Sequence, residues 1–341
     1  MATIKQVAER AQVSVATVSR VINETGLVSP DLEQRVRAAM EDLNYYPSAL
    51  GRGLRRSETM TIGVLIPELD QPFFSALVSS VESALFRQDY RTLVCSAEED
   101  PAREAAYIQI LLQQRVDGVI YVPTGQQAGN VSKLRKSSVP VVLVDRDVST
   151  YQVDKVMCDN ESGAYEGMSH LIKQGHRRIG VIGGPDYSFA ILRRMAGVRR
   201  ALADAAMPLN SQFLIMGTLQ QFELGYQTAM HLLTQPERPT AIFALTDMIA
   251  IGVLHTASRL GLHLPGDLSV MGFDDIPLAT YSIPELTTVA QPIYEMGALA
   301  TKLLLARLHD HDRPYEQHIL DARLVVRNSV AGAATHDPLL K

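Results

Sequence analysis

Two kinds of hydrophobic pattern divide the chain near residue 59. In the first part, apolar side chains recur at helical spacing, as at Ile4, Val7 and Ala8. In the second part, short continuous runs of Val, Ile and Leu alternate with stretches of helical periodicity. The pattern predicts a small all-α head followed by a larger α/β body.

Capping signals mark the predicted helices of the head. Thr3 and Ser14 each precede an apolar periodic stretch, where a hydroxyl accepts a hydrogen bond from the first turn. Ser29-Pro30-Asp31 supplies a capping hydroxyl, a first-turn proline and an acid near the positive end of the helix dipole. Helix, tight turn and helix within the first 23 residues form a helix-turn-helix arrangement. A small helical bundle with a solvated face has the same periodicity and is the alternative.

The apolar runs of the body predict strands, and the stretches between them predict helices. The strands are predicted at 61–67, 91–96, 116–123, 139–145, 178–184, 240–246 and 268–274. The helices are predicted at 75–88, 102–114, 163–174, 194–206 and 248–260. Continuous apolar strands separated by helices are typical of parallel sheets covered on both faces. Because roughly 270 residues exceed one comfortable sheet, we predict two doubly wound parallel-sheet subdomains.

Composition and charge fit a globular chain with a basic head. The 341 residues are 46% hydrophobic and 20% charged, with a net charge of −5. Residues 1–56 hold eight Lys and Arg against six Asp and Glu, and the remainder holds 24 against 31. This balance permits a nucleic-acid partner for the head alone. Cys95 and Cys158 lie in apolar runs without a C-x-x-C spacing, so we expect buried, reduced thiols.

The sequence predicts neither a membrane span nor a secretory signal. No apolar run approaches the roughly 18 residues that a membrane helix needs, and the N-terminus is amphipathic. We therefore expect a cytoplasmic protein with no membrane partner.

Small and polar side chains line one side of the second predicted helix. Val15 or Ala16 can contact a thymine methyl group, and Arg20 can donate to guanine O6 and N7. Hydroxyls and the helix N-terminus can contact phosphates. The predicted DNA-binding residues of the head are Thr3, Ser14, Val15, Ala16, Thr17, Ser19, Arg20 and Asn23.

Two long segments, TIKQVAERAQVSVATVSRVIN and VSPDLEQRVRAAMEDLNYYPSALGRGLRR, resemble the head and hinge of the LacI/GalR family of bacterial transcription regulators. The similarity continues through GHRRIGVIGG, MGFDDI and LTTVAQP to about Arg327. The resemblance implies operator DNA as partner, a homodimer, a periplasmic-binding-protein-like effector body and no cofactor. It also implies that Val15 and Ala16 select operator bases, with Arg20 as a further reader. Gln12 stands where family heads commonly carry Gly, so a positive φ there would strain the turn.

The linker at 47–58 carries a predicted DNA contact of a different kind. By resemblance it folds on operator DNA, where Leu54 corresponds to the leucine that wedges into the minor groove between Arg52 and Arg55. An apolar wedge unstacks a base step at a cost of a few kcal/mol, and the DNA bends onto more protein. Gly51 and Gly53 depart from the commoner Ala and Ser, which predicts a larger ordering cost because each internal glycine costs a helix about 1 kcal/mol. The alternative is that Leu54 docks on the core.

Polar and aromatic residues follow the predicted strands at the carboxyl ends, where parallel sheets bind ligands. The candidates for effector binding are Phe73, Phe74, Asp145, Arg194, Thr246, Asp247, Asp274 and Gln291. Carboxylates and an arginine can hold vicinal hydroxyls, and an aromatic face can stack on a sugar ring. The resemblance implies effector contacts at the same places.

Several of these residues have a plainer interpretation. One of Phe73 and Phe74 is expected in the core, and Asp247 is an alternative cap for a helix starting at Met248. Arg194 and Asp274 can form a buried ion pair, although such a pair in a cleft usually binds a ligand.

The effector class is predicted from departures within the family. Purine repressors place an Arg and a Thr shortly before the arginine that matches Arg194, whereas this chain has Ser188 and Ala190. Their stacking aromatic falls on Leu219 in a loose alignment. We therefore expect a sugar or sugar derivative, with a purine-responsive repressor as the alternative.

Two other protein classes are weighed against the regulator. For an enzyme, GVIGGP lacks the G-x-G-x-x-G spacing, and neither a P-loop nor a G-x-S-x-G elbow occurs. The cluster from His309 to Asp312 is interpreted as a solvated turn and not as a metal site. For a solute-binding transport protein the body would serve, but the DNA-reading head and the missing signal peptide argue against it.

The predicted organisation follows from these segments. We expect a DNA-binding head at 1–46, a hinge at 47–58, an N-subdomain at 59–160 and 290–320, a C-subdomain at 161–289 and 321–330, and a flexible tail at 331–341. The expected function is repression of a carbohydrate operon by a dimer on a pseudo-palindromic operator. The chain lacks a leucine heptad after Arg327, so no coiled-coil tetramer is expected.

Overall fold

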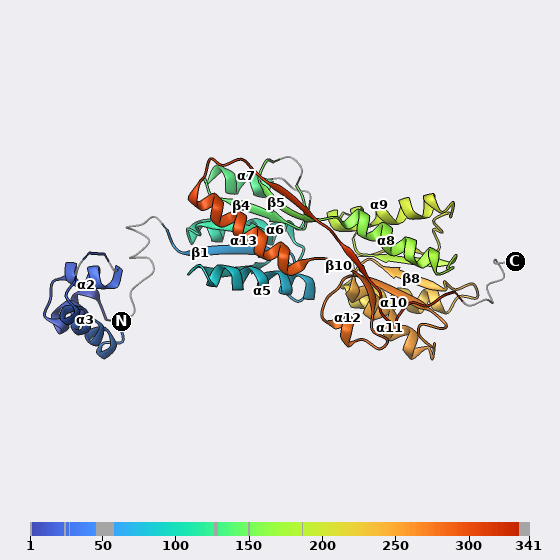
Figure 1. The fold of residues 1–341 in the computed structure, drawn as a ribbon, viewed down its shortest axis with the longest axis horizontal. Coiled ribbons are helices and arrows are strands. Elements are labelled where there is room, and N and C mark those ends of the chain that lie inside the picture. Colours follow the sequence, from blue (N-terminus) through green and yellow to red (C-terminus); the bar gives the residue numbers. More distant parts are fainter. Residues whose placement is uncertain are drawn as a thin grey trace. The chain divides into compact units, whose positions relative to one another are not determined.

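The structure is a computed structural model that describes residues 2–23, 25–26, 28–45, 58–125, 129–148, 151–185 and 187–333. The described residues form two compact units, a small N-terminal head and a larger body (Figure 1). Arg52, Leu54 and Arg55 of the predicted hinge lie outside the described residues, as does most of the predicted tail. Their predicted roles stay predictions.

The head is a bundle of short helices around its own apolar core. Its helices are α1 (Ile4–Ala11), α2 (Val15–Asn23) and α3 (Pro30–Asp42). The side chains that fill the core come from all three helices and are Val7, Ala8, Ala11, Val18, Val21, Val36 and Ala39. The predicted helical head is confirmed, and the buried side of α2 leaves its opposite side exposed.

Two of the three predicted caps form. The Thr3 hydroxyl accepts from the backbone N–H of Gln6, whose side chain in turn accepts from the Thr3 N–H at 2.8 Å. The Ser14 hydroxyl accepts from the Thr17 N–H at 3.1 Å. The predicted side-chain cap at Ser29 is wrong: this residue precedes Pro30 and contributes only its backbone carbonyl, which accepts from the Glu33 N–H at 3.0 Å.

The turn between α1 and α2 is left-handed at Gln12. This residue has φ +53° and ψ +47°, and its N–H caps α1 by donating to the carbonyls of Ala8 and Glu9. A side chain in this conformation clashes with its own backbone, a penalty that glycine avoids. The positive φ that the sequence analysis considered is therefore present.

The body contains two sheets of six strands each. The first sheet consists of β1 (Thr61–Ile66), β2 (Arg91–Ser96), β3 (Gly118–Tyr121), β4 (Val141–Val144), β5 (Asp154–Cys158) and β11 (Gln317–Leu320) in the order β11-β5-β4-β3-β1-β2. Its helices are α5 (Pro72–Phe86), α6 (Pro101–Gln113), α7 (Gly129–Lys136) and α13 (Ile293–His309).

The second sheet has the same architecture. It consists of β6 (Ile179–Gly183), β7 (Leu214–Met216), β8 (Ala241–Ala244), β9 (Ser269–Asp274), β10 (Thr287–Ala290) and β12 (Arg323–Val325) in the order β12-β10-β9-β8-β6-β7. Its helices are α8 (Asn160–Lys173), α9 (Phe189–Asp204), α10 (Gln221–Leu233), α11 (Asp247–Arg259) and α12 (Leu278–Tyr281). The predicted pair of doubly wound sheets is confirmed.

One strand departs from the predicted parallel order. β12 pairs with β10 in the antiparallel direction, whereas β10, β9, β8, β6 and β7 pair in parallel. The chain leaves β11 at the carboxyl edge of the first sheet and enters the second sheet after two residues (Figure 1). Because it arrives at the carboxyl edge of the second sheet, its strand there runs against the others.

The chain passes between the sheets at three places: β5 to α8, β10 to α13, and β11 to β12. Each connection leaves one sheet at its carboxyl edge. The two sets of strand ends that bind ligands in such sheets therefore face the same connecting segments.

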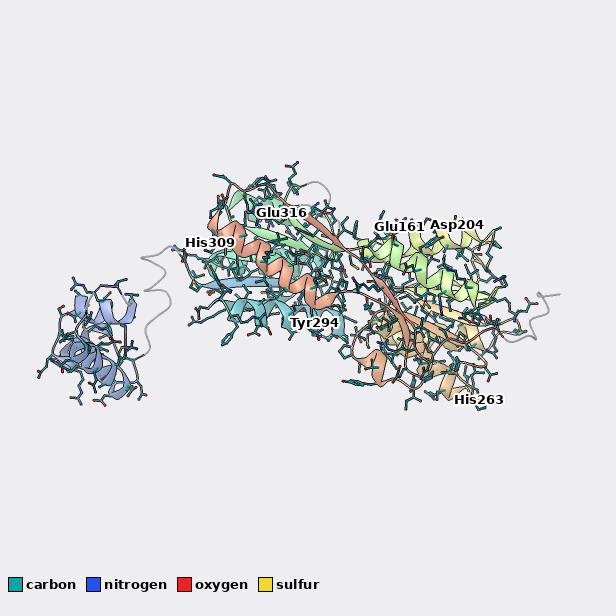
Figure 2. All side chains as sticks on the ribbon, viewed as in Figure 1. Glu161, Asp204, His263, Tyr294, His309 and Glu316 are labelled. Carbon is teal, nitrogen blue, oxygen red and sulfur yellow. The ribbon has the colours of Figure 1, made fainter. Side chains whose placement is uncertain are left out.

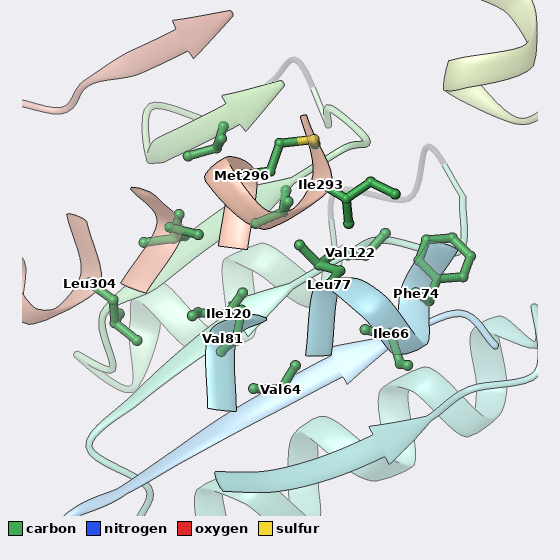
Figure 3. Close-up of a cluster of buried hydrophobic side chains, with 14 of the residues drawn as sticks. Val64, Ile66, Phe74, Leu77, Val81, Ile120, Val122, Ile293, Met296 and Leu304 are labelled. Atoms are coloured by element: carbon green, nitrogen blue, oxygen red, sulfur yellow. The ribbon is translucent and has the colours of Figure 1, made fainter. Parts of the chain in front are cut away.

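The core of the first subdomain joins helices from distant parts of the sequence. Side chains of α5, α13, β1 and β3 meet in one apolar cluster (Figure 3). Phe74 and Leu77 from α5 belong to it together with Ile293 and Met296 from α13. Cys95 and Cys158 are buried free thiols, as predicted. None of the described helices is both long and apolar enough to cross a bilayer.

Candidate functional site

The exposed side of α2 carries the residues predicted to read bases. Val15 is 42% exposed, and Ala16 and Arg20 are exposed as well, whereas Val18 and Val21 face the core. Small residues at the start of this helix leave its N-terminal end open to close approach. The side of the helix that is predicted to read bases is thus exposed, and its other side packs in the bundle.

The remaining predicted DNA contacts in the head are exposed or half-buried and have local partners. The Ser14 and Thr17 hydroxyls lie 2.9 Å apart. The Asn23 amide donates to the Ser19 carbonyl at 2.6 Å and to the Ser19 hydroxyl at 3.2 Å. These contacts order the ends of α2, and Thr3 orders the start of α1.

A cavity lies between the carboxyl ends of the two sheets. Among the residues predicted to bind an effector, those that line it are Phe73, Phe74, Asp145, Arg194, Thr246 and Asp274. They come from both subdomains: three lie at or just after the ends of β4, β8 and β9, and the other three lie on α5 and α9, the helices that follow β1 and β6. Asp247 and Gln291 are not among the lining residues and lie behind them.

Arg194 is held in a fixed position on the floor of the cavity. It is only 3% exposed, and its guanidinium stacks on the Phe273 ring at 3.8 Å. Its nitrogens donate to Asn160 Oδ1 at 2.7 Å and to the Leu245 carbonyl at 2.5 Å, and Nη2 lies 2.9 Å from Asp274 Oδ1. Three partners and a stacking surface orient the group before any ligand arrives.

Asp274 pairs with this arginine in a strained backbone conformation. Its φ of +117° is a region that residues with side chains rarely adopt, and such strain is typical of functional sites. The Gln291 amide donates to Asp274 Oδ1 at 2.9 Å, so it positions the carboxylate from behind. Burial raises the pKa of Asp274 to about 6, and the charge of Arg194 limits that rise.

Asp247 neither lines the cavity nor caps a helix that starts at Met248, the two roles predicted for it. Helix α11 begins at this residue and is capped by Thr246, whose hydroxyl accepts from the Ile249 N–H. The Asp247 carboxylate accepts from the Ile276 N–H at 2.9 Å and from the Thr288 hydroxyl at 2.5 Å. Burial raises its pKa well above the usual range. It ties the loop after β9 to α11 and β10.

A second tie holds the same loop. Arg327 Nη2 lies 2.6 Å from Asp275 Oδ1, and its Nη1 donates to the Leu286 carbonyl at 2.8 Å. Asp275 also has a positive φ, of +59°. The strained pair of residues at the end of β9 is therefore fixed from both sides.

Asp145 and Arg146 form the opposite wall of the cavity. Asp145 has φ +65° and is 3% exposed, and its Oδ1 has no hydrogen-bond partner among the described residues. Arg146 forms a two-pronged ion pair with Glu99, at 2.7 and 3.0 Å, and lies over the Phe74 ring at 5.5 Å. Burial raises the pKa of Asp145, opposed by the nearby arginines.

Phe73 and Phe74 supply the aromatic surface. Their rings meet edge to face at 5.2 Å with an interplanar angle of 78°. Pro72 starts α5 and places both residues in its first turn, where both line the cavity and both belong to the apolar cluster. We expected one of the two to be buried in the core alone, but both also line the cavity.

Comparisons with known proteins agree along the whole chain. Residues 3–48 match the family of bacterial regulatory proteins, lacI family, and residues 168–330 match the periplasmic binding protein-like domain. The HTH-type transcriptional repressor PurR of Photobacterium profundum is 34% identical over 331 residues, which cover 97% of this chain and 99% of that protein. The chain belongs to the LacI family. It is a DNA-binding transcription regulator.

Two further relatives of this LacI-family chain bear on its function. The ribose operon repressor of Haemophilus influenzae is 36% identical over 330 residues, covering 97% of this chain and 99% of that protein. The structure of the lac repressor dimer bound to operator and an anti-inducer has a TM-score of 0.85 at 27% identity, covering 97% of this chain and 99% of that one. These relatives are transcriptional regulators, which are not enzymes.

The LacI-family cavity also contains residues that the sequence analysis missed. Arg146 and Glu99 line it as an ion pair, and Tyr187 and Gln221 line its C-subdomain side. Arg146 directly follows the predicted Asp145, so the same strand-end rule would have found it. Glu99 lies in the turn between β2 and α6, three residues after β2 ends, so the strand-end rule would have found it as well.

The cluster from His309 to Asp312 is a solvated turn, and its residues are not among those that line the cavity. All four residues are exposed at the end of α13, where Figure 2 labels His309. His309 Nδ1 lies 2.9 Å from the Leu305 carbonyl of its own helix. In the described part of this LacI-family chain, no group of three His, Cys, Asp or Glu residues is arranged to hold a metal ion.

Proposed function

We propose that the protein is a dimeric, cytoplasmic repressor of a carbohydrate operon, which binds a pseudo-palindromic operator and responds to a sugar or sugar derivative. The observation that carries the effector half of this proposal is the set of buried groups that face the cavity. Asp145 and Asp274 supply acceptors, Arg194 supplies a fixed donor, and Phe73 and Phe74 supply an apolar surface. Paired hydroxyls and a ring face are the chemistry that such a set recognises.

The DNA half of the proposal assigns roles on α2 and in the hinge. Val15 and Ala16 contact operator bases from the exposed start of the helix, and Arg20 donates to a guanine. Similarity to the lac repressor dimer on its operator supports a symmetric pair of heads. Leu54 enters the minor groove between the two halves, flanked by Arg52 and Arg55.

We assign the head to 1–46, the hinge to 47–58, the N-subdomain to 59–160 with 290–320, and the C-subdomain to 161–289 with 321–330. Effector binding moves one subdomain against the other through their three connections. That motion changes the spacing of the two hinges in the dimer, and with it operator affinity. A coupling of about 1–3 kcal/mol is usual for two linked sites.

A purine effector is the second candidate, because a PurR protein and a ribose operon repressor match this chain at similar identity. The cavity favours a sugar. Ser188 and Ala190 line it where purine repressors carry an Arg and a Thr. Leu219 is 48% exposed and is not among the lining residues, so it offers no stacking surface.

A thermal-shift screen of sugars, sugar derivatives and purines tests the proposed effector class. A ligand at 100 times its dissociation constant stabilises the fold by about 2.7 kcal/mol. We expect a shift with a sugar or sugar derivative and its loss in Arg194→Gln, which removes the charge on the cavity floor. Shifts confined to purines would overturn the sugar class. Fluorescence anisotropy of a labelled DNA duplex measures DNA binding by the protein in a separate experiment.

A further inference from the structure

The charges on the cavity wall restrict the ligand further. The charged side chains among the described lining residues are Glu99, Asp145, Arg146, Arg194 and Asp274. Three are acidic and two are basic. Both guanidinium groups already form close ion pairs, Arg146 with Glu99 at 2.7 Å and Arg194 with Asp274 at 2.9 Å. The cavity therefore has an excess of negative charge.

Asp145 carries that excess. Its closest approach to a cation is 3.8 Å, between Oδ2 and Arg146 Nε, and Oδ1 has no hydrogen-bond partner among the described residues. A buried carboxylate oxygen without a donor is costly. A ligand that places a hydroxyl there removes this cost, whereas a ligand that places another anion there increases it.

A neighbour of the lining residues adds the same sign. Glu68 interacts electrostatically with Glu99 and Arg146, and burial and the negative charge of Glu99 raise its pKa above the usual range. A phosphate or carboxylate on the ligand would approach Glu99 and Asp145 with both lining arginines already paired. The wall therefore does not match an anionic group on the ligand.

We propose that the effector is a sugar that carries no phosphate or carboxylate, with hydroxyls that donate to Asp145 and Asp274 and oxygens that accept from Arg146 and Arg194. This inference rests on the proposed sugar response and narrows it. It excludes sugar phosphates and sugar acids as the physiological ligand.

Calorimetry on the full-length protein with matched ligand sets tests the inference. The sets are ribose with ribose 5-phosphate, glucose with glucose 6-phosphate and gluconate, and galactose with galactose 6-phosphate and galacturonate. We expect one neutral sugar to bind and each of its charged forms to bind at least 100-fold more weakly. A charged form that binds as tightly as its parent would overturn the inference and leave the sugar response standing. Binding of purines alone would overturn both.

Asp145→Asn tests the residue that carries the argument. The amide has the same size and keeps one acceptor, but it removes the unpaired charge. We expect the neutral sugar to bind at least tenfold more weakly and the penalty for its phosphate to shrink. Asp204→Asn, at an exposed residue that ends α9 (Figure 2), is the matched control and should change neither value. An unchanged penalty in a folded Asp145→Asn protein, checked by circular dichroism, would contradict the role of Asp145.

Discussion

Asp274 combines a buried charge with a strained backbone at the end of β9. Burial raises its pKa to about 6, and Arg194, 2.9 Å away, keeps the rise from being larger. A carboxylate that must accept hydroxyls is useful only while ionised. The protonation of this one residue therefore links effector binding to pH.

We expect effector affinity to fall as the pH drops below 6. Near pH 5 a group with a pKa of about 6 is roughly one-tenth ionised, so the dissociation constant should rise about tenfold between pH 7.5 and 5. The contribution of Asp274 to the stability of the free protein changes with pH in the opposite direction. Because the pKa is raised, this group stabilises the fold when protonated, and that contribution is lost as the pH rises through about 6.

Calorimetry at both pH values measures the affinity change. Asp274→Asn is the control, because it removes the titrating group and should flatten the remaining pH dependence. A wild-type affinity that is the same at pH 5 and pH 7.5 would contradict the assignment.

The positive φ of Gln12 leads to a prediction about the stability of the head. Gln12→Gly relieves a φ of +53° and should stabilise the head by about 0.5–1 kcal/mol. Hydrogen exchange of the amides in α1 and α2 measures this in the full chain. Glu9→Gly places the same residue in the ordinary helical backbone of α1 and should destabilise the head instead. Slower exchange in both variants, or in neither, would show that the turn is not strained.

For single residues, the sequence predicted which ones lie near the strand ends but not which way their side chains point. Six of the eight predicted effector residues line the cavity, because the strand-end rule depends only on topology. Asp247 and Gln291 lie one layer behind, since the first turns inward to an N–H of the β9 loop and the second to Asp274. Side-chain direction depends on tertiary contacts that no local pattern records.

At the scale of elements, the loop after β9 is held by α11 and by Arg327, which follows β12. Asp247 binds its backbone at Ile276, and Arg327 binds Asp275. The strain at Asp274 persists only while such contacts outweigh it. Contacts outside the cavity therefore set the geometry inside it.

We expect Arg327→Ala to weaken effector binding about tenfold, or about 1.4 kcal/mol, although Arg327 does not line the cavity. Loss of the Asp275 ion pair lets the loop relax away from the position that Asp274 needs. Calorimetric affinity is the measurement. Arg323→Ala, at an exposed residue of β12 four positions earlier in the chain, serves as the control and should bind normally. Equal affinities in all three proteins would show that the tie is unnecessary.

Buried charges and short, half-exposed runs account for strands that the sequence patterns missed. The predicted strands are runs of apolar residues buried on both faces, but β5 (Asp154–Cys158) includes two charged residues. Asp154 pairs with Arg307 at 3.0 Å and Lys155 with Asp147 at 2.6 Å, so both charges are buried without interrupting the strand. The short strands β7, β11 and β12 are half-exposed and carry too little apolar pattern to be recognised.

Helix α13 was missed for the opposite reason. It lies against α5 and the first sheet, and buried residues recur along most of its length from Ile293 to Arg307. A helix covered on several sides shows a weak periodicity, which is the signal that sequence analysis needs. The helices found from sequence have one buried stripe and one solvated side.

At the scale of the whole molecule, three connections join two sheets whose carboxyl ends line one cavity. A ligand that contacts both walls of the cavity favours one relative orientation of the two subdomains over others. In the mechanism that we propose, that relation sets the distance between the two predicted hinges of the dimer. The predicted wedge at Leu54 is the point where we expect this distance to act on DNA.

We expect Leu54→Ala to reduce operator affinity by at least tenfold, because an alanine cannot hold a base step apart. The variant should keep the effector affinity of the wild type, since Leu54 belongs to the predicted hinge and not to the cavity. Anisotropy titration of labelled operator measures the loss. A Leu54→Ala protein that binds operator as tightly as wild type would refute the wedge.

The most direct test of the account measures operator affinity with and without the bound sugar. The duplex is one that the protein itself selects from a random pool, and the sugar is the one found by calorimetry. The account predicts a change of about 5- to 150-fold in the dissociation constant for DNA at saturating sugar. At a sugar concentration near the wild-type dissociation constant, Asp145→Asn should show a much smaller change than the wild type. A protein that binds both the duplex and the sugar, with neither affecting the other, would contradict it.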